Sequence, residues 1–197
     1  MSSIRPGEDP ENISDGRRRK GEQRRRLLLD ATMRVIERDG VTAVSQRRVA
    51  AEAEVPPSTV TYYYATVDDL LVDALTRVND AYVALVDALP EDPDEALRGF
   101  AALIAEGAGA DRAHALAEME LFLISARRPS LRSQTERWSA AVDAFLAPYL
   151  PDPAARAGVA AASDGYFLRC CTMDPQPSAE EVHRALRRLI DREHPAR

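Results

Sequence analysis

The 197-residue sequence predicts an all-α protein, in which a three-helix N-terminal unit precedes a larger helical bundle. Apolar residues recur every three or four positions through most of the chain, and no segment alternates apolar and polar residues as a strand does. Proline, glycine and helix-capping residues interrupt this pattern where helices would end and begin. Apolar residues make up 45% of the chain, which suits a packed helical core.

The first helix is expected after a polar segment, residues 1–16, that we expect to be disordered. It should begin near the arginines at 24–26. Its apolar stripe falls at i, i+3, i+4, i+7 and i+8 and consists of Leu28, Ala31, Thr32, Val35 and Ile36. Asp39 and Gly40 end this helix, with Gly40 expected in the left-handed helical conformation that glycine favours.

Two short helices and a long one follow, each marked at its start. Ser45 is a candidate N-cap for the second helix. A turn at residues 54–56 separates it from a third helix, which begins with Pro57 at its first position. Thr66 and Asp69 form a variant capping box that opens a long fourth helix.

Five more helical segments complete the predicted bundle. They lie at about residues 94–108, 111–127, 130–147, 153–173 and 178–192. The predicted domains are a disordered tail at 1–16, a three-helix domain with a basic N-terminal arm at 17–66, and a helical domain at 67–197.

Charge is distributed unevenly along the chain. The net charge is −6, yet residues 1–66 carry 12 basic and 10 acidic side chains. The segment "GRRRKGEQRRR" sets one acidic residue, Glu22, against Arg17, Arg18, Arg19, Lys20, Arg24, Arg25 and Arg26. Such an arm predicts a polyanionic partner. A solubilising tail is the alternative, but arginines in the first turn of a helix would oppose its dipole, which favours an external anion.

The third helix, at about 57–64, carries three consecutive tyrosines with different expected environments. Side chains advance by about 100° per residue on a helix, so Val60 and Tyr64 share a face that must be buried. The opposite face and its flanks carry Pro57, Ser58, Thr59, Thr61, Tyr62 and Tyr63. Two short helices joined by a turn form a helix-turn-helix, whose second helix lies in the major groove of DNA. An ordinary amphipathic helix with surface tyrosines is the alternative.

Residues 24–71 resemble the DNA-binding domain of TetR-family transcriptional repressors. The family commonly shows a pattern like "AGVSKGTLYYHFPSKEALL", where this chain has "AEVPPSTVTYYYATVDDLL". The resemblance implies that Arg47 contacts bases and that Tyr62 and Tyr63 contact phosphates. With the basic arm, the expected DNA-contacting residues are Arg17, Arg18, Arg19, Lys20, Arg24, Arg47, Pro57, Ser58, Thr59, Thr61, Tyr62 and Tyr63.

The chain departs from the family pattern at three positions. Glu54 stands where glycine is usual, and a positive φ there would cost about 1 kcal/mol. Pro56 replaces a serine N-cap, so the capping hydrogen bond is lost or moved to Ser58. Val67 replaces a lysine that contacts phosphate, and we expect the arginine arm to supply that charge from the adjacent minor groove or flanking phosphates.

The resemblance also implies a homodimer and a pocket for a small-molecule effector within residues 67–197. The last two helices would form the dimer, and a face of small residues suits this role: Gly158, Ala161, Ala162 and Gly165. The pocket candidates are Phe100, Ile104, Met119, Phe122, Trp138, Phe145, Tyr166, Cys170 and Met173, although each is more often simple core.

An acidic residue in this apolar stretch could pair with a cationic ligand. Glu118 and Glu120 are two residues apart, so both cannot face inward. Glu120 falls in line with Leu116 and Leu123 and is expected to be the inner one. A salt bridge at the rim to a neighbouring arginine is the alternative.

Other functions find little support in the sequence. No catalytic motif or metal-ligand spacing occurs, so we expect no enzymatic activity, metal or cofactor. Cys170 and Cys171 are expected to be reduced and buried. The arm lacks interleaved large apolar residues, which argues against a membrane partner. The sequence shows no secretory apolar segment and no apolar run near transmembrane length, so we expect a cytoplasmic protein.

The sequence therefore predicts a ligand-responsive repressor, released by a small-molecule effector, that binds a palindromic double-stranded DNA operator as a homodimer. Arginine far outnumbers lysine, which suggests a GC-rich bacterial genome. A protein that binds nucleic acid without sequence preference, through its arginine-rich arm, is the alternative.

Overall fold

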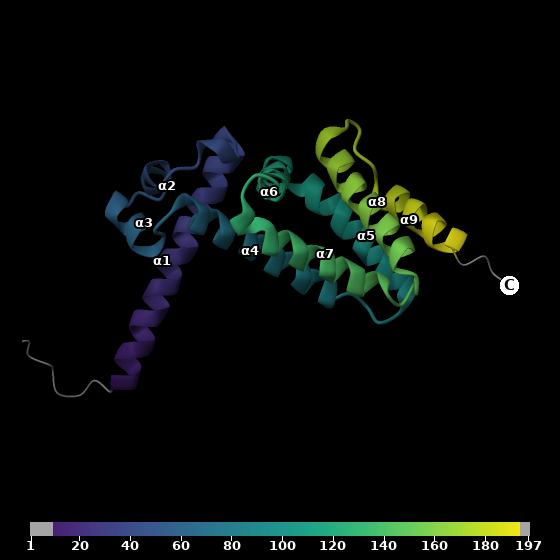
Figure 1. Ribbon diagram of the computed structural model, residues 1–197, viewed down its shortest axis with the longest axis horizontal. Coiled ribbons are helices and arrows are strands. Elements are labelled where there is room, and N and C mark those ends of the chain that lie inside the picture. Colours follow the sequence, from purple (N-terminus) through teal and green to yellow (C-terminus); the bar gives the residue numbers. More distant parts are fainter. Residues whose placement is uncertain (1–9, 194–197) are drawn as a thin grey trace, which may run out of the picture.

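The computed structural model describes residues 10–193, and within that range the side chains of 18–107 and 111–192. This part of the chain contains helices and no strand, as predicted (Figure 1). Its elements are α1 (Pro10–Asp39), η1 (Val41–Ala43), α2 (Gln46–Glu52), α3 (Pro57–Tyr63), α4 (Val67–Asp87), α5 (Pro93–Ala110), α6 (Arg112–Ile124), η2 (Pro129–Leu131), α7 (Arg132–Leu146), α8 (Pro153–Thr172) and α9 (Ala179–Glu193), where η denotes a 3₁₀ turn.

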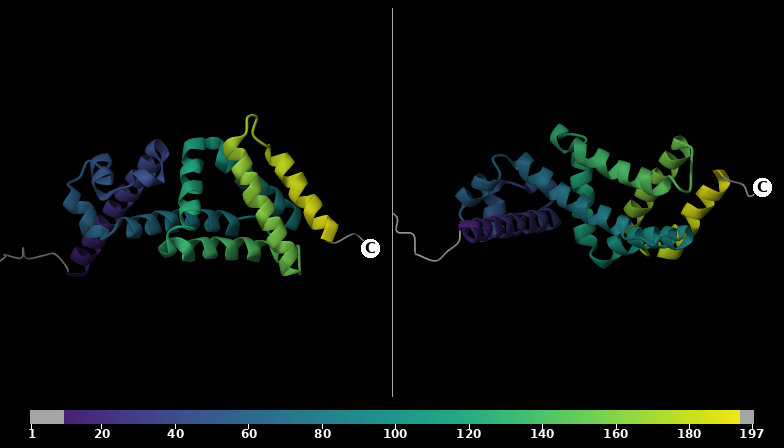
Figure 2. Two further views of the ribbon diagram at one scale, coloured as in Figure 1. Left: turned by 45° about the horizontal axis from the view of Figure 1, so that its top comes forward. Right: turned by 90° about the horizontal axis from the view of Figure 1, so that it is seen from below.

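Two groups of helices are joined by α4 (Figures 1 and 2). One group contains α1, α2 and α3, and the other contains α5, α7, α8 and α9. α4 starts beside α1 and continues along α7 into the second group. α6 stands between the groups and contacts α1, α4, α5 and α8. None of the helices in the described range is long and apolar enough to cross a membrane.

Local sequence signals fix where several helices begin. The Ser45 hydroxyl accepts from the Arg48 N–H at 3.2 Å and caps α2, as predicted. The Thr66 hydroxyl accepts from the Asp69 N–H at 3.0 Å, and Asp69 accepts from the Thr66 N–H at 2.9 Å. This capping box confirms the predicted start of α4. The helices α5, α6 and α8 are capped by Asp92, Asp111 and Asp152.

Each group of helices has its own hydrophobic core. The first core joins α1, α2 and α3 to the N-terminal half of α4, and it also takes in Leu121 of α6 and Leu131 of η2. The second core lies between α5, α7, α8 and α9 and includes both cysteines. The N-terminal core therefore extends beyond residue 66, because α4 and α6 close it from the side of the second group.

The start of α1 differs from the prediction. The helix begins at Pro10, so residues 10–16 are helical, and residues 1–9 lie outside the described part of the chain. Proline suits the first position of a helix, and arginine, lysine, glutamate and glutamine are strong helix formers. The arginines at 24–26 are therefore inside α1 rather than in its first turn, and the argument from the helix dipole does not apply to them.

The end of α1 also differs in detail. Gly40 has a positive φ as expected, but at φ 81° and ψ 161° it lies outside the left-handed helical region. This extended conformation leads the chain into η1 before α2 begins. Neither η1 nor η2 was expected from the sequence.

Candidate functional site

The exposed face of α3 carries most of the residues expected to contact DNA. Pro57, Ser58, Thr61 and Tyr62 are exposed, whereas Thr59 and Tyr63 are half-buried. Tyr62 is 82% exposed. The rings of Tyr62 and Tyr63 meet edge to face with centroids 5.1 Å apart. Two phenols therefore stand together on the surface of α3.

The inner face of α3 holds the helix in place. Val60 and Tyr64 are 0% and 3% exposed, which confirms their predicted burial. The Tyr64 hydroxyl donates to Asp73 on α4 at 2.6 Å. Burial and this hydrogen bond raise the pKa of Tyr64 above its usual value. Arg25 of α1 also pairs with Asp73, at 3.5 Å, so α1, α3 and α4 meet at one carboxylate.

The turn between α2 and α3 has a positive φ at the position where the family usually has glycine. Glu54 adopts a φ of 53°, in the region that favours glycine. Pro56 occupies the N-cap position of α3 without a side-chain hydrogen bond. Gln46 of α2 instead fastens the far end of α3, donating to the carbonyl oxygens of Tyr64 and Ala65 at 2.7 and 3.0 Å.

The basic residues lie on α1 and α2. Arg47 is exposed on α2. The basic arm is part of α1, whose N-terminal half extends away from α2 and α3 in Figure 1. Its exposed members with described side chains include Arg18, Arg19, Lys20 and Arg24. The side chain of Arg17 lies outside the described set.

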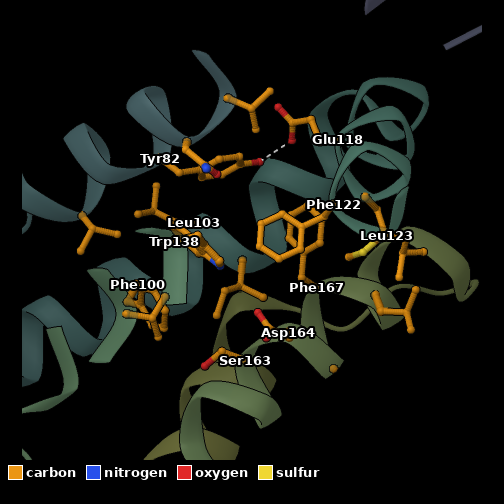
Figure 3. A pocket seen from close by; sticks show the side chains of 18 residues that line it. Tyr82, Phe100, Leu103, Glu118, Phe122, Leu123, Trp138, Ser163, Asp164 and Phe167 are labelled. Carbon is orange, nitrogen blue, oxygen red and sulfur yellow. Dashed lines mark hydrogen bonds between the residues drawn. The ribbon is translucent and has the colours of Figure 1, made fainter. Parts of the chain in front are cut away.

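The second candidate site is a cavity of about 350 Å³ among α4, α5, α6, α7 and α8 (Figure 3). Its walls are largely apolar and aromatic, and none of its described lining residues is lysine, arginine or histidine. The lining residues are Val78, Asn79, Tyr82, Val86, Phe100, Leu103, Ile104, Glu118, Met119, Phe122, Leu123, Trp138, Val142, Ser163, Asp164, Gly165, Phe167 and Leu168. Leu123 and Leu168 are 65% and 46% exposed, so the cavity opens to the surface beside them.

Two carboxylates lie on opposite sides of the cavity in Figure 3. Glu118 of α6 accepts a hydrogen bond from the Tyr82 hydroxyl at 2.8 Å. Burial raises the pKa of Glu118, although this hydrogen bond and the nearby His114 oppose the rise. Burial likewise raises the pKa of Asp164 on α8, against a hydrogen bond from Trp138. A ligand cation would therefore find two carboxylates in apolar surroundings.

Five of the expected pocket residues line the cavity: Phe100, Ile104, Met119, Phe122 and Trp138. Four do not. Phe145 packs between Phe100 and Tyr149, with centroids 4.6 and 5.6 Å away. Tyr166 packs against the second core from the side. Cys170 is fully buried, with its Sγ 3.7 Å from the Pro177 carbonyl oxygen.

The prediction that Glu120 faces the cavity is wrong. Glu120 instead accepts a hydrogen bond from the Val41 N–H at 2.6 Å, in η1 directly after α1. Glu118 is the acidic residue of α6 that lines the cavity. The error arose because Leu116 and Leu123 were taken to mark the inner face of α6, whereas Leu116 is 38% exposed and Leu123 lies at the open edge of the cavity.

None of the residues of α4 and α8 that line the cavity was expected there from the sequence. Val78, Tyr82 and Val86 belong to α4, a helix from which no pocket residue was expected. The polar residues Ser163 and Asp164 of α8 sit beside small residues that had suggested only a dimer face. A charged residue within an apolar helix was the available signal for Asp164.

Two family models match these two regions. The model of bacterial regulatory proteins of the tetR family matches residues 28–74, and that of the tetracyclin repressor-like C-terminal domain matches residues 91–192. The chain belongs to the TetR family. The resemblance inferred from the third helix is thereby confirmed. Members of this family are DNA-binding transcriptional regulators with a ligand-binding C-terminal domain.

Solved structures support the same assignment. The multidrug binding protein EbrR complexed with ethidium has a TM-score of 0.73 and 37% identity, with 84% of this chain and 97% of that chain covered. The TetR-family member SCO1917 from Streptomyces coelicolor A3 has a TM-score of 0.76 and 37% identity, again with 84% and 97% covered. SCO7518 from Streptomyces coelicolor A3(2) has a TM-score of 0.73 and 29% identity, with 85% and 98% covered. No curated protein sequence matches the chain.

Proposed function

We propose that this TetR-family chain is a repressor that binds a palindromic DNA operator as a homodimer and leaves it when a lipophilic cation enters the cavity. The observation that carries the proposal is the cavity itself. It combines aromatic walls and two carboxylates with no basic residue among its described lining. Such a site favours a flat or bulky apolar molecule with a positive charge.

Exposed side chains of α1 and α3 support the proposal for DNA binding. We propose a DNA-binding domain at residues 17–66, with α3 as the recognition helix in the major groove. Tyr62 and Tyr63 would donate to phosphates, while Ser58 and Thr59 are small enough to let α3 approach the bases. The exposed basic residues of α1 would contact flanking phosphates, which makes binding salt-dependent.

The homodimer is supported by the surface of α8. Gly158, Ala161 and Gly165 are exposed, and a Cβ added at either glycine would meet no atom within 4 Å. The backbone of a partner helix can approach such a surface closely. By contrast, Leu186 and Ile190 of α9 are buried within the subunit. A symmetric dimer would place two copies of α3 about 34 Å apart, one turn of DNA.

The chemical class of the ligand is supported by a relative. EbrR structures contain ethidium, proflavin and malachite green, which are aromatic cations. In this chain Tyr82, Trp138 and Phe167 form edge-to-face pairs at the cavity, with ring centroids 5.8 and 6.4 Å apart. Their ring faces can stabilise a cation that Glu118 and Asp164 neutralise.

Communication between the two sites would pass through α4. This helix starts at Val67, separated from the recognition helix by residues 64–66, and its later turns supply Val78, Tyr82 and Val86 to the cavity wall. A ligand that moves α4 therefore changes the placement of α3. In a dimer, this would alter the spacing of the two recognition helices and lower operator affinity.

Selection of genomic DNA fragments by the purified protein, followed by sequencing, tests the proposal. A short palindrome shared by the recovered fragments would support a dimeric, sequence-specific regulator. Fragments with no shared motif would contradict it. The alternative of nonspecific binding through the arginine-rich arm would then take its place.

A further inference from the structure

A chain of hydrogen bonds leads from the cavity wall to the DNA-binding domain. The Tyr82 hydroxyl donates to Glu118 Oε2 at 2.8 Å, and Glu118 Oε1 lies 3.3 Å from His114 Nε2. The other ring nitrogen, His114 Nδ1, lies 2.5 Å from Glu37 Oε1 on α1. One imidazole ring on α6 therefore joins a carboxylate of the cavity to a carboxylate of the DNA-binding domain.

A protonated ring suits this position. Both nitrogens of His114 face carboxylate oxygens, and only the imidazolium form can donate from both. The side chains of Glu118 and Glu37 are 12% and 24% exposed, so water screens the two contacts only in part. Burial lowers the pKa of His114, but the hydrogen bond to Glu37 and the charges of Glu118, Glu37 and Asp111 outweigh it and raise the pKa above its usual value.

The groups around His114 come from four helices. Glu37 lies on α1. Tyr82 on α4 is connected to His114 through Glu118. Asp111 caps α6, and Arg112 lies in its first turn. Burial raises the pKa of the Cys171 thiol on α8, and the charges of Glu118 and Arg112 also act on this thiol. Three carboxylates face one arginine in this group, so a positive charge on His114 reduces its net negative charge.

We propose that a cation entering the cavity neutralises Glu118, displaces His114 from it and thereby weakens the charged contact of His114 with Glu37, which links α6 to α1. The inference rests on the proposed function, because it takes the effector to be a lipophilic cation. Glu118 carries a single negative charge, which the ligand and the imidazolium cannot both neutralise. Ligand binding therefore favours the neutral imidazole, and His114 releases its proton to the solvent.

The consequence for the DNA-binding domain follows from how α6 holds it. Beside the His114–Glu37 contact, α6 also binds η1 through Glu120, which accepts from the Val41 N–H at 2.6 Å. When the imidazole becomes neutral, its contact with Glu37 loses the attraction between two charges, and the end of α1 is held less firmly. Exchange of the Val41 amide hydrogen with solvent should then become faster.

The pH dependence of ethidium binding tests the competition, because ethidium keeps its charge while His114 titrates. The contact of His114 with Glu118 is fully present at low pH and is lost as pH rises through the raised pKa. Ethidium affinity of the full-length protein, measured by fluorescence without DNA from about pH 5.5 to pH 8.5, should rise with pH. The rise should approach about tenfold per pH unit while His114 is protonated.

Three variants test whether the rise of ethidium affinity with pH comes from His114. His114→Gln should lose it, apart from a remainder at low pH that belongs to Glu118 and Asp164, whose pKa values burial also raises. His183→Gln is the matched control on α9 and should retain the wild-type slope. Glu37→Gln removes a carboxylate that raises the pKa of His114, so its slope should shift to lower pH.

Hydrogen exchange at Val41 tests the link to α1. Ethidium should accelerate exchange in the wild type, whereas His114→Gln should exchange fast both with and without ethidium. If ethidium binds and His114→Gln keeps the full slope, or if Val41 exchange does not respond, the inference is overturned and the proposed function stands. If ethidium binds at no pH, the cationic effector is wrong and the inference fails with it.

Discussion

The DNA-binding helices and the cavity hold their polar groups in opposite ways. In the first region charges are paired between helices: Arg34 and Arg38 of α1 both bind Glu52 of α2, at 2.7 and 2.8 Å, and Arg77 of α4 binds Asp30 at 2.6 Å. In the cavity, two carboxylates face apolar walls with no basic residue among the described lining. The first arrangement holds the helices in a fixed position relative to one another. The second leaves space for a ligand and negative charge that the ligand can neutralise.

The two regions should also differ in packing density. Truncating a leucine should therefore destabilise the protein more in the N-terminal core than at the cavity wall. Leu71 is fully buried in the N-terminal core, whereas Leu103 lines the cavity and is only half-buried. Leu71→Ala should lower the free energy of unfolding by about 3 kcal/mol, and Leu103→Ala by about 1 kcal/mol. Urea unfolding of both variants measures the difference. Equal losses would show that the cavity wall is as tightly packed as the core.

The two carboxylates of the cavity should contribute unequally to cation binding. Glu118→Gln should weaken ethidium binding about thirtyfold, or about 2 kcal/mol, because its side chain is nearly buried and its charge poorly screened. Asp164→Asn is the matched variant on the exposed side and should weaken binding by about threefold. Fluorescence titration measures both. A larger loss for Asp164→Asn would place the ligand's charge at the opposite side of the cavity.

The exposed phenol of α3 should act on DNA and not on the fold. Tyr62→Phe should reduce affinity for a selected operator by about 1 kcal/mol, because a phosphate loses one hydrogen bond. Tyr149→Phe makes the same change at a hydroxyl that donates to the Pro93 carbonyl oxygen at 2.7 Å, far from α3, and should leave DNA affinity unchanged. A loss of dimerisation in Tyr62→Phe would contradict the assignment of this face to DNA.

The smallest expected effect concerns the turn before α3. Glu54→Gly should increase the free energy of unfolding by up to about 1 kcal/mol, because glycine adopts the φ of 53° without strain. Glu54→Ala removes the same charge but keeps the Cβ, so it should give no such gain. Thermal unfolding compares the two variants. An equal gain in both would attribute the effect to charge rather than to the backbone.

The sequence predicted the DNA-binding region well because its signals are local. A proline at the start of α3, serine and threonine caps and a helical period together place Val60 and Tyr64 inside and Tyr62 outside. The capping residues Ser45 and Thr66 act within a few positions of themselves. None of these inferences needed knowledge of a distant segment.

The cavity could not be predicted as well because distant contacts decide it. α6 has apolar residues on several sides, so its period left the inner face ambiguous. The bond between Glu120 and the Val41 N–H joins segments 79 residues apart and turns Glu118 toward the cavity. Likewise, the length of α1 was underestimated because a run of charged residues was taken as a boundary although it forms a stable helix.

Release of operator DNA by tetraphenylphosphonium tests the central claim most directly. This lipophilic cation is bulky and does not intercalate, so it acts on the protein alone. Wild-type protein should leave a selected operator as the cation is added, and Glu118→Gln should need about thirtyfold more of it. If the two proteins are released at the same concentration, or if neither is released, the cavity does not control DNA binding through its carboxylate.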